Sequence, residues 1–330
     1  MAIVTKNAHA WFVTTNSSGK KQTVYNNETE KHNYPFGFEI HFSDVPQPQQ
    51  NTVTLYNLSK SHSNFYRKKQ KCYVAWNWNS TERKILAEGY ITKIDVTQHD
   101  GTTDTKNITF TEGADYNNLD ARTLKETKNK KVKKTKTKKE HIPGHFEHLK
   151  SGKKKWVKGK TVNKHYHTRE NKKIRVNKTY RKGTSYKSLI KGIASQSGVK
   201  IAKIDLAKNP KLKRPYTASG KPLSLIKQLV KKTGSKMTYV RGKLEIVNPK
   251  SGKRTWYEID DQDLVQPPSS NEDNGGEKTW EITIPLVPEI TTNTGIIMKS
   301  KYLKGRYYVK SGTHSFDGDS PQTQCSLARL

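Results

Sequence analysis

The sequence contains only two cysteines, Cys72 and Cys325, and they lie far apart. Cys72 falls in the apolar, strand-like run CYVAWNW, which favours a small buried side chain over a disulfide or a metal ligand. Long apolar runs are also missing, since none approaches the ~18 residues of a membrane-spanning helix. The opening MAIVTKNAHAWFVTT lacks the apolar core of a signal peptide. We therefore expect a protein that is made in the cytosol and does not insert into a membrane.

Apolar residues make up only 31% of the 330 residues, which is low for a chain with one large core. The length suits two or three domains on the usual prior of about 150 residues each. The apolar residues cluster in runs typical of strands. Several small β-rich domains are therefore favoured over one large α/β core.

Acidic residues are scarce, and they are scarcest in one block. The formal net charge is +33, and residues 128–182 hold 22 Lys or Arg against three acids, Glu140, Glu147 and Glu170. This block, which opens with KNKKVKKTKTKK, carries +19, and the rest of the chain shares +14. Such a run is typical of nucleic-acid binding, of contact with an anionic surface, or of a solvated segment. Its position between patterned segments excludes a free tail.

Motifs of the common enzyme classes are absent from the sequence. GKT at 159–161 resembles the end of a phosphate-binding loop, but Lys154 occupies the position that requires the first glycine. Neither HExxH nor GxSxG occurs. We expect DDQD (260–263) and Asp317-Gly318-Asp319 to be solvated turns, because further oxygen ligands for a cation are missing. With no nucleophile, base or metal to name, we expect no enzymatic activity and no cofactor.

Five of the eleven histidines lie in the basic block, and imidazoles that converge on one ion are a common metal site. Pro143-Gly144 breaks the helix that would align His141 with His145. No cysteine or nearby aspartate completes a ligand set. We therefore expect solvated, lysine-flanked histidines and no bound metal.

Residues 1–118 are predicted to form a β-barrel-like domain. YPFGFEIHF alternates apolar and polar residues with the period typical of a half-buried strand, and NTVTLYNL and CYVAWNW continue the pattern. AEGYITKIDVTQ and KNITFTEGA are joined across HDGT (99–102), whose Asp-Gly is a strong hairpin signal. About six strands with few helical patterns favour a sandwich or a small barrel.

Residues 183–254 predict a small α/β domain of two helices and a hairpin. In GTSYKSLIKGIASQSG, apolar residues recur at helical spacing between an N-terminal Ser or Thr and Gly198. GKPLSLIKQLVKKTG repeats this formula, with Pro222 near the first helical position and Gly234 at the C-cap. MTYVRGKLEIV is expected to form two strands that turn at Arg241-Gly242.

Strand patterns return in residues 255–330, in TWYEI, KTWEITI, GIIMKSK, GRYYVKSGTHSF and TQCSLARL. They predict a second β-barrel-like domain, similar to the first. The expected fold is thus mainly β with a small α/β unit. Two β-barrel-like domains flank the helix–helix–hairpin domain, and a Lys-rich insertion at 119–182 precedes that domain.

The insertion itself is predicted to form two β-hairpins, Lys155-Trp156-Val157 to Val162, and His165-Tyr166-His167 to Ile174-Arg175-Val176. Aromatic residues between cations can stack on bases, whereas lysines bind phosphate without reading sequence. The alternatives are a plain basic hairpin and a solvated face. The residues that we expect to contact a partner are Lys128, Lys131, Lys134, Lys139, Lys154, Trp156, Tyr166 and Arg175.

The order of these segments resembles that of baseplate hub proteins of contractile-tailed phages, the Mu-type tail hub family related to late control protein D. In that family a strand and a Pro-rich bend lead into Asn-x-Val-x-Leu-Tyr-Asn-Leu, matched here by Asn51, Val53, Leu55, Tyr56, Asn57 and Leu58. Glu88-Gly89-Tyr90-Ile91 matches the strand that comes next. The two helices and the closing IPLVPEITTNTGIIMKSKYLKGRYYVKSGTHSFDGDS follow in the family's order, and residues 124–182 depart from it.

The resemblance implies an architecture. Hub subunits of this family form a homotrimer in which each chain contributes two similar β-barrels. The resulting ring has near-sixfold symmetry and docks the hexameric tail tube, while its threefold face receives the spike. A β-domain at each end of the chain suits such an adaptor, and edge strands would pair between subunits.

We therefore expect a structural hub of a phage tail and baseplate, assembled in the host cytoplasm and carried in the virion, with a channel for genome ejection. Its expected partners are the tail tube, spike, baseplate wedge and tape-measure proteins, and DNA in transit. A nucleic-acid-binding protein that uses residues 128–182 is the main alternative, and an enzyme is disfavoured. A protein partner is favoured for the insertion, because DNA that passes through a tail must not be held.

Overall fold

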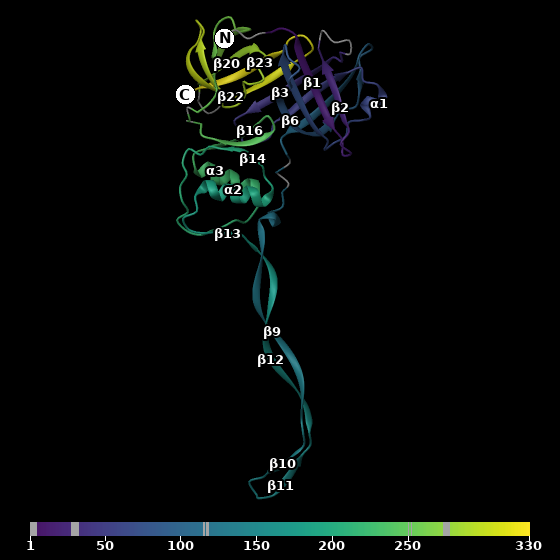
Figure 1. Ribbon diagram of the computed structural model, residues 1–330, viewed down its shortest axis with the longest axis vertical. Coiled ribbons are helices and arrows are strands. Elements are labelled where there is room, and N and C mark those ends of the chain that lie inside the picture. Colours follow the sequence, from purple (N-terminus) through teal and green to yellow (C-terminus); the bar gives the residue numbers. More distant parts are fainter. Residues whose placement is uncertain are drawn as a thin grey trace.

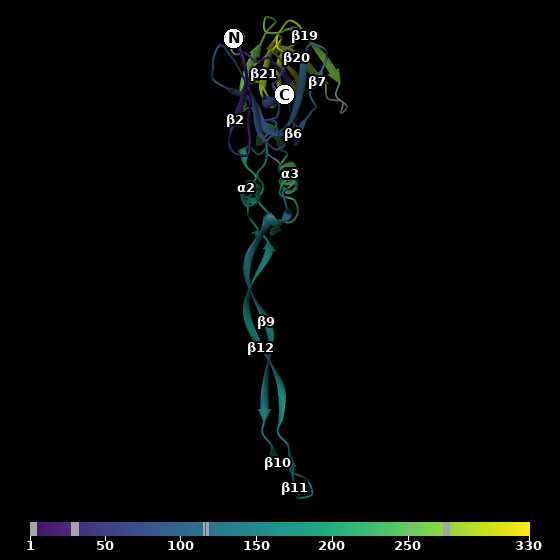
Figure 2. The ribbon, with the colours of Figure 1, turned by 90° about the vertical axis from the view of Figure 1, so that its right-hand side faces the viewer.

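The computed structural model describes residues 5–27, 33–114, 116, 119–249, 251, 253–272 and 278–330. The molecule consists of a β-rich head, a small helical unit beside it, and one long thin arm that extends away from both (Figures 1 and 2). The C-terminal end lies in the head, where Leu330 N donates to Arg306 O (Figure 1).

The N-terminal half of the head is a run of antiparallel strands. They are β1 (Ala8–Thr15), β2 (Lys21–Asn26), β3 (Phe36–Ser43), β4 (Gln50–Tyr56), β5 (Lys71–Trp78), β6 (Lys84–Ile94), β7 (Gln98–His99) and β8 (Asp104–Glu112), with the short helix α1 (Lys60–Ser63) after β4. Alternate residues of β3 and β4 point into one core around Phe12, Phe110 and Trp76, as the period of two predicts. The hairpin at HDGT is confirmed, since β7 pairs with β8 across a turn in which Asp100 accepts from the backbone of Thr102 and Thr103.

The C-terminal strands form a second core but share one sheet with the first half. They are β18 (Trp256–Ile259), β19 (Gln266–Glu272), β20 (Lys278–Pro285), β21 (Gly295–Lys299), β22 (Lys304–Phe316) and β23 (Gln322–Arg329). β22 pairs with β3 from Ser311↔Ser43 to Phe316↔Phe38, and this joins the two halves into a 14-stranded sheet. The prediction of a mainly β fold is confirmed. The prediction of barrels is not, because the ladder among the described residues runs from β19 to β2 without closing.

The α/β unit follows the prediction closely. Its helices are α2 (Tyr186–Ser197) and α3 (Pro222–Lys232), and its strands are β13 (Thr179–Tyr180), β14 (Ile201–Ile204), β15 (Tyr216–Thr217), β16 (Lys236–Val240) and β17 (Lys243–Val247). Ser185 caps α2, whose C-terminus is Gly198 in the left-handed conformation, and β16 and β17 turn at Arg241-Gly242. One detail differs: the C-cap of α3 is Thr233, and Gly234 is the left-handed residue just after it.

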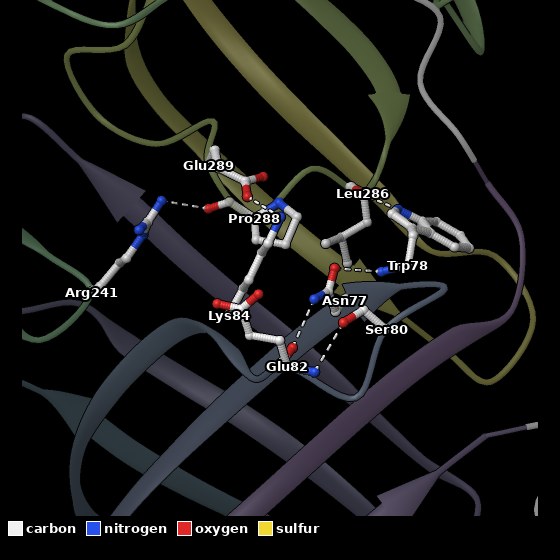
Figure 3. Close-up of polar contacts among 9 residues, drawn as sticks. All are labelled: Asn77, Trp78, Ser80, Glu82, Lys84, Arg241, Leu286, Pro288 and Glu289. Atoms are coloured by element: carbon white, nitrogen blue, oxygen red, sulfur yellow. Dashed lines mark hydrogen bonds and ion pairs between the residues drawn. The ribbon is translucent and has the colours of Figure 1, made fainter.

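The loop after β20 holds the parts of the head together (Figure 3). Each of three residues from elsewhere contacts this loop: Trp78 Nε1 donates to Leu286 O over 2.6 Å, Lys84 Nζ lies 2.5 Å from Glu289 Oε1, and Arg241 donates to Pro288 O over 3.0 Å. Trp78 and Lys84 come from the N-terminal strands and Arg241 from the turn of the α/β unit. One loop therefore ties both other parts of the chain to the C-terminal half.

The arm consists of β9 (Lys125–Ile142) and β12 (Lys160–Asn177), followed outward by β10 (His145–His148) and β11 (Lys154–Val157). The 3-10 turn η1 (Ala121–Leu124) precedes it, and Leu124 is buried in the core of the α/β unit. At about 3.3 Å per residue, the two 18-residue strands are about 60 Å long. Both views show the pair as a twisted ribbon with no other element beside it (Figures 1 and 2).

Candidate functional site

The arm is one unbroken antiparallel ladder that starts at the α/β unit. Its register runs without a shift from Lys125↔Asn177 to Ile142↔Lys160. At the base, Lys178 N donates to Leu124 O over 3.2 Å, so the two strands leave and re-enter the α/β unit side by side. Within the described residues both outer edges of the ribbon are unpaired. An isolated two-stranded ribbon is at best marginally stable in water, so this arm is expected to gain order from a partner.

The two predicted hairpins of the insertion are wrong. His165-Tyr166-His167 and Ile174-Arg175-Val176 lie on the same strand, β12, and Trp156 pairs with Phe146 instead of with the segment at Val162. The chain reverses at Ser151-Gly152, where Gly152 has a positive φ of 79°. Lys158-Gly159 is not a turn, because it lies opposite Pro143-Gly144 at a kink between the two ladders. The sequence did not indicate this register, because β9 and β12 are rich in lysine. Around the two predicted turns there is no alternation of apolar residues that would mark a continuous strand.

The first face of the ribbon, which we call the mixed face, carries the even-numbered residues of β9 and β12. Successive side chains of a strand point to opposite sides, and the register places even residues opposite even ones. This face holds every acidic and apolar residue of the two strands, together with eight lysines and Thr168. The acidic and apolar residues are Glu126, Glu140, Glu170, Val132, Ile142, Val162, Tyr166, Ile174 and Val176.

Ion pairs partly neutralise the mixed face. Glu170 lies 3.2 Å from Lys134 and 3.6 Å from Lys136, and the hydrogen bond from Lys134 is the main cause that holds the pKa of this carboxyl below its usual value. Glu140 pairs with Lys164 over 3.1 Å. Because these side chains are solvent-exposed, such pairs contribute little to stability, but they lower the field on this side of the ribbon.

The second face, which we call the donor face, carries the odd-numbered residues of the same strands. It has no acid and no apolar side chain. Its members are Lys125, Lys131, Lys133, Lys139, Lys173, Arg169, Arg175, His141, His165, His167, Thr127, Thr135, Thr137, Thr161, Asn129, Asn163, Asn171 and Asn177. Threonine and histidine lie opposite each other three times on this face, at Thr135–His167 (3.2 Å), Thr137–His165 (3.0 Å) and His141–Thr161 (3.5 Å).

The structure does not bring the predicted contact residues together on one surface. Lys128, Lys134 and Tyr166 lie on the mixed face, whereas Lys131, Lys139 and Arg175 lie on the donor face. Lys154 and Trp156 lie at the tip of the arm. The prediction missed four cations of the donor face, Lys125, Lys133, Arg169 and Lys173. The signal was in the sequence, because every acid and apolar residue of the two strands has an even number.

The tip of the arm has an exposed aromatic pair. Phe146 and Trp156 lie with their ring centroids 4.7 Å apart in an edge-to-face arrangement and are 61% and 52% exposed. A Cβ added to Gly144 would lie 2.5 Å from the Trp156 ring, so this glycine lets the indole pack against the kink. Both rings are therefore largely open to solvent at the end of the arm.

Titratable groups in the head are buried singly and do not form a catalytic constellation. Burial raises the pKa of Glu112 to about 7, and its Oε1 accepts from Gly242 N over 2.7 Å. Burial lowers the pKa of His314 to about 3, and burial also raises the pKa of the Cys72 and Cys325 thiols, which are free. Asp261 accepts from Ser300 and the Lys301 backbone, in the turn predicted at 260–263. In the described part of the chain, no group of His, Cys, Asp and Glu is arranged to hold a metal ion.

No helix among the described residues is long and apolar enough to cross a membrane. The sequence matches no protein-family model and no curated protein.

Solved structures do resemble the chain over nearly its whole length. A 43 kDa tail protein of prophage MuSo2 from Shewanella oneidensis superposes with a TM-score of 0.59 at 11% identity, covering 97% of this chain and 98% of that one. A tail protein from Neisseria meningitidis gives 0.54 at 9% identity, with 98% and 96% covered. An E. coli component of the type VI secretion system, described as structurally similar to bacteriophage tail proteins, gives 0.53 at 8% identity over 92% and 76%. The chain therefore has the fold of phage tail proteins, as the order of its segments led us to expect.

Proposed function

We propose that the chain is a structural hub subunit of a phage-type tail. It forms a homotrimer that joins the hexameric tail tube to the central spike and the baseplate, around a channel for genome ejection. The observation that supports this most is the whole-chain likeness to a prophage tail protein, which leaves little of either chain uncovered. Such a subunit is assembled in the host cytoplasm and carried in the virion.

The head supports an adaptor of this kind through its two β-rich halves. Each half has its own core, one around Phe12 and Trp76 and the other around Ile284 and Val309. Three chains would place these halves in a ring of alternating, similar units, which matches a tube of sixfold symmetry with a spike of threefold symmetry. Among the described residues, β2 and β19 are the outermost strands of the sheet, so neighbouring subunits can pair along this side of each strand.

For the arm, we propose a protein contact on the mixed face, with the spike, a baseplate wedge protein or the tape-measure protein. The apolar side chains of Val132, Tyr166 and Ile174 lie there, and aromatic and apolar residues are what protein interfaces bury. A function without enzymatic chemistry is proposed for the whole chain, because the solved structures that it resembles are described as tail proteins.

The second candidate is a nucleic-acid-binding protein that acts outside a tail. The charge of residues 128–182 favours it, and such a protein would bind with a steep dependence on salt concentration. A hub is a trimer whose assembly does not need nucleic acid. The two functions therefore differ in what the purified chain does alone.

Light scattering and class averages of the purified chain test the proposal, and deletion of residues 128–182 tests the arm. We expect a trimer with pseudo-sixfold averages, and we expect the deletion to leave the trimer intact while abolishing incorporation into baseplates. A monomer that forms no ring in the presence of tail tube protein would contradict the hub. Normal baseplate incorporation of the deletion variant, with only DNA delivery impaired, would contradict the protein contact of the arm.

A further inference from the structure

We propose that the donor face of the arm is a docking surface for the phosphate backbone of double-stranded nucleic acid. The proposal depends on which side chains the strand register places on each face of the ribbon, and not on the net charge of the arm alone. It deepens the proposed tail function, in which a duplex passes the hub, but the binding itself does not require a hub.

The chemistry of the donor face suits phosphate. All of its side chains, lysine, arginine, histidine, asparagine and threonine, can donate hydrogen bonds, whereas phosphodiester oxygens only accept them. No carboxylate lies on this face to repel a polyanion. The glutamates and the ion pairs are confined to the mixed face.

Fixed cations also lie along most of the face. Six of the nine cross-strand pairs of donor-face residues include a Lys or Arg, and the other three place a Thr opposite a His. Consecutive pairs are about 6.7 Å apart, and the face is about 60 Å long, which is the length of about 18 base pairs. A long face of hydrogen-bond donors with repeated positive charges is the complement of a regular polyanion, whereas a folded protein presents acidic residues in patches.

The composition of the face disfavours the two other partner classes. Protein interfaces bury aromatic and apolar residues, and the donor face has none. Proteins that bind single strands stack bases on aromatic side chains, but Tyr166 is on the mixed face and Trp156 is at the tip. A twisted two-stranded ribbon, in contrast, fits a duplex groove.

Such a contact does not need to arrest DNA in transit. Lysine contacts to phosphate carry no sequence information and allow a protein to slide along the duplex. The bare ribbon also benefits, because Lys133 and Arg169 lie directly opposite each other and like charges in this position destabilise a strand pair. Phosphates between them would remove that repulsion.

Two matched triple variants of the full-length chain test the proposal. The first is Lys131→Gln, Lys133→Gln and Arg169→Gln on the donor face. The second is Lys130→Gln, Lys138→Gln and Lys172→Gln on the mixed face, where these three lysines have no ion pair among the contacts of the described residues. Each variant loses three charges from the same exposed ribbon. Fluorescence anisotropy would measure binding to a duplex of about 20 base pairs, to its single strand and to poly-glutamate, each over a range of salt.

We expect the donor-face variant to bind the duplex at least about tenfold more weakly at about 0.15 M salt and to lose about 2.7 from the slope of log K against log salt. The mixed-face variant should stay within about threefold of the wild type, because charges on the far side are screened. Equal losses in both variants, or no duplex binding by the wild type, would overturn the proposal. Tighter binding of poly-glutamate than of the duplex would assign the face to an acidic protein instead. If the chain is monomeric but still binds the duplex through this face, the proposed hub function is contradicted and the proposed duplex binding is not.

Discussion

The indole nitrogen of Trp78 donates a hydrogen bond to the backbone carbonyl of Leu286 over 2.6 Å, between residues that are 208 positions apart in the sequence. Leu286 is fully buried and belongs to the core of the N-terminal half, although it follows a C-terminal strand. This contact and the β3–β22 pairing fix the two halves of the head as one body. The proposed hub function is consistent with such a fixed connection between the halves.

Replacing Trp78 with phenylalanine keeps an aromatic ring and removes the donor. The Leu286 carbonyl would then be buried without that partner, which costs about 1–3 kcal/mol of unfolding free energy. Urea denaturation of the head measures this. The control is Trp156→Phe at the exposed arm tip, where a change within about 0.5 kcal/mol is expected. Equal effects from the two substitutions would contradict the role of the Trp78 contact.

Glu112 provides a pH-dependent test of the junction with the α/β unit. Its folded pKa of about 7 lies above the unfolded value of 4.5, so the folded state keeps the proton longer and this group makes stability fall as pH rises from about 4.5 to 7. Glu112→Gln keeps an acceptor for Gly242 N and does not titrate. The variant should therefore gain on the order of 2 kcal/mol relative to wild type between pH 5 and pH 8. If the difference in unfolding free energy between Glu112→Gln and wild type is constant over this range, Glu112 does not titrate there. Glu258→Gln, which removes an exposed carboxylate, serves as the control.

His314 has the opposite pH dependence. It is fully buried, and its folded pKa of about 3 lies below the unfolded value of 6.5, so its contribution to stability is lost as pH falls from about 6.5 towards 3. Its Nδ1 lies 2.8 Å from Thr323 Oγ1. His314→Asn should be less stable than wild type at pH 7, and that deficit should shrink by about 1.4 kcal/mol per pH unit on acidification. A pH-independent deficit for His314→Asn would refute the assignment.

Gly242 tests how tightly the α/β unit is docked on the head. It has a positive φ of 81°, and a Cβ there would lie 2.4 Å from the carbonyl oxygen of Glu88. Gly220 also has a positive φ, of 109°, but a Cβ there would meet nothing within 4 Å. Gly220→Ala should therefore cost only the backbone strain, about 1 kcal/mol, and Gly242→Ala about 3 kcal/mol or more. Thermal denaturation of both variants measures the two effects. Equal decreases in Tm would mean that the turn at Gly242 moves away from Glu88 at no cost.

Engineered disulfides test the register of the arm directly. Thr135 and His167 are Cα partners on the donor face, so Thr135→Cys with His167→Cys should oxidise to an intramolecular disulfide. Thr135→Cys with Thr168→Cys places the thiols on opposite faces and should not. The native cysteines are buried and do not interfere. Mass spectrometry after mild oxidation detects the disulfide. Efficient disulfide formation in the second pair would mean that the register is shifted by one residue and that the two faces of the ribbon are assigned wrongly.

Local signals in the sequence were sufficient for the α/β unit. Ser185 and Gly198 bound α2 because one side chain caps the first turn and the other residue adopts a left-handed backbone without strain. The stripe of Leu225, Ile226, Leu229 and Val230 is buried as its spacing predicts. Each of these signals lies within one element, so reading it did not require a distant strand partner to be identified.

Pairing between distant strands was beyond the reach of such signals. β3 and β22 are both half-buried strands with the expected alternation, but nothing local specifies that Ser43 and Ser311 are partners. The two predicted barrels therefore became one open sheet. In the arm the reason was different. The acidic and apolar residues alternate with a period of two, but the many lysines obscure this alternation until β9 and β12 are aligned as partners on either side of Ser151.

The close approach of Leu124 and Lys178 at the base of the arm has an evolutionary consequence. Because the backbone leaves and re-enters the α/β unit at nearly the same point, a short turn could replace all the residues between Leu124 and Lys178 without repacking a core. One recombination event would thus suffice to gain, lose or exchange the arm. Chains that share this fold could then keep the head unchanged while the arm diverges in length and sequence.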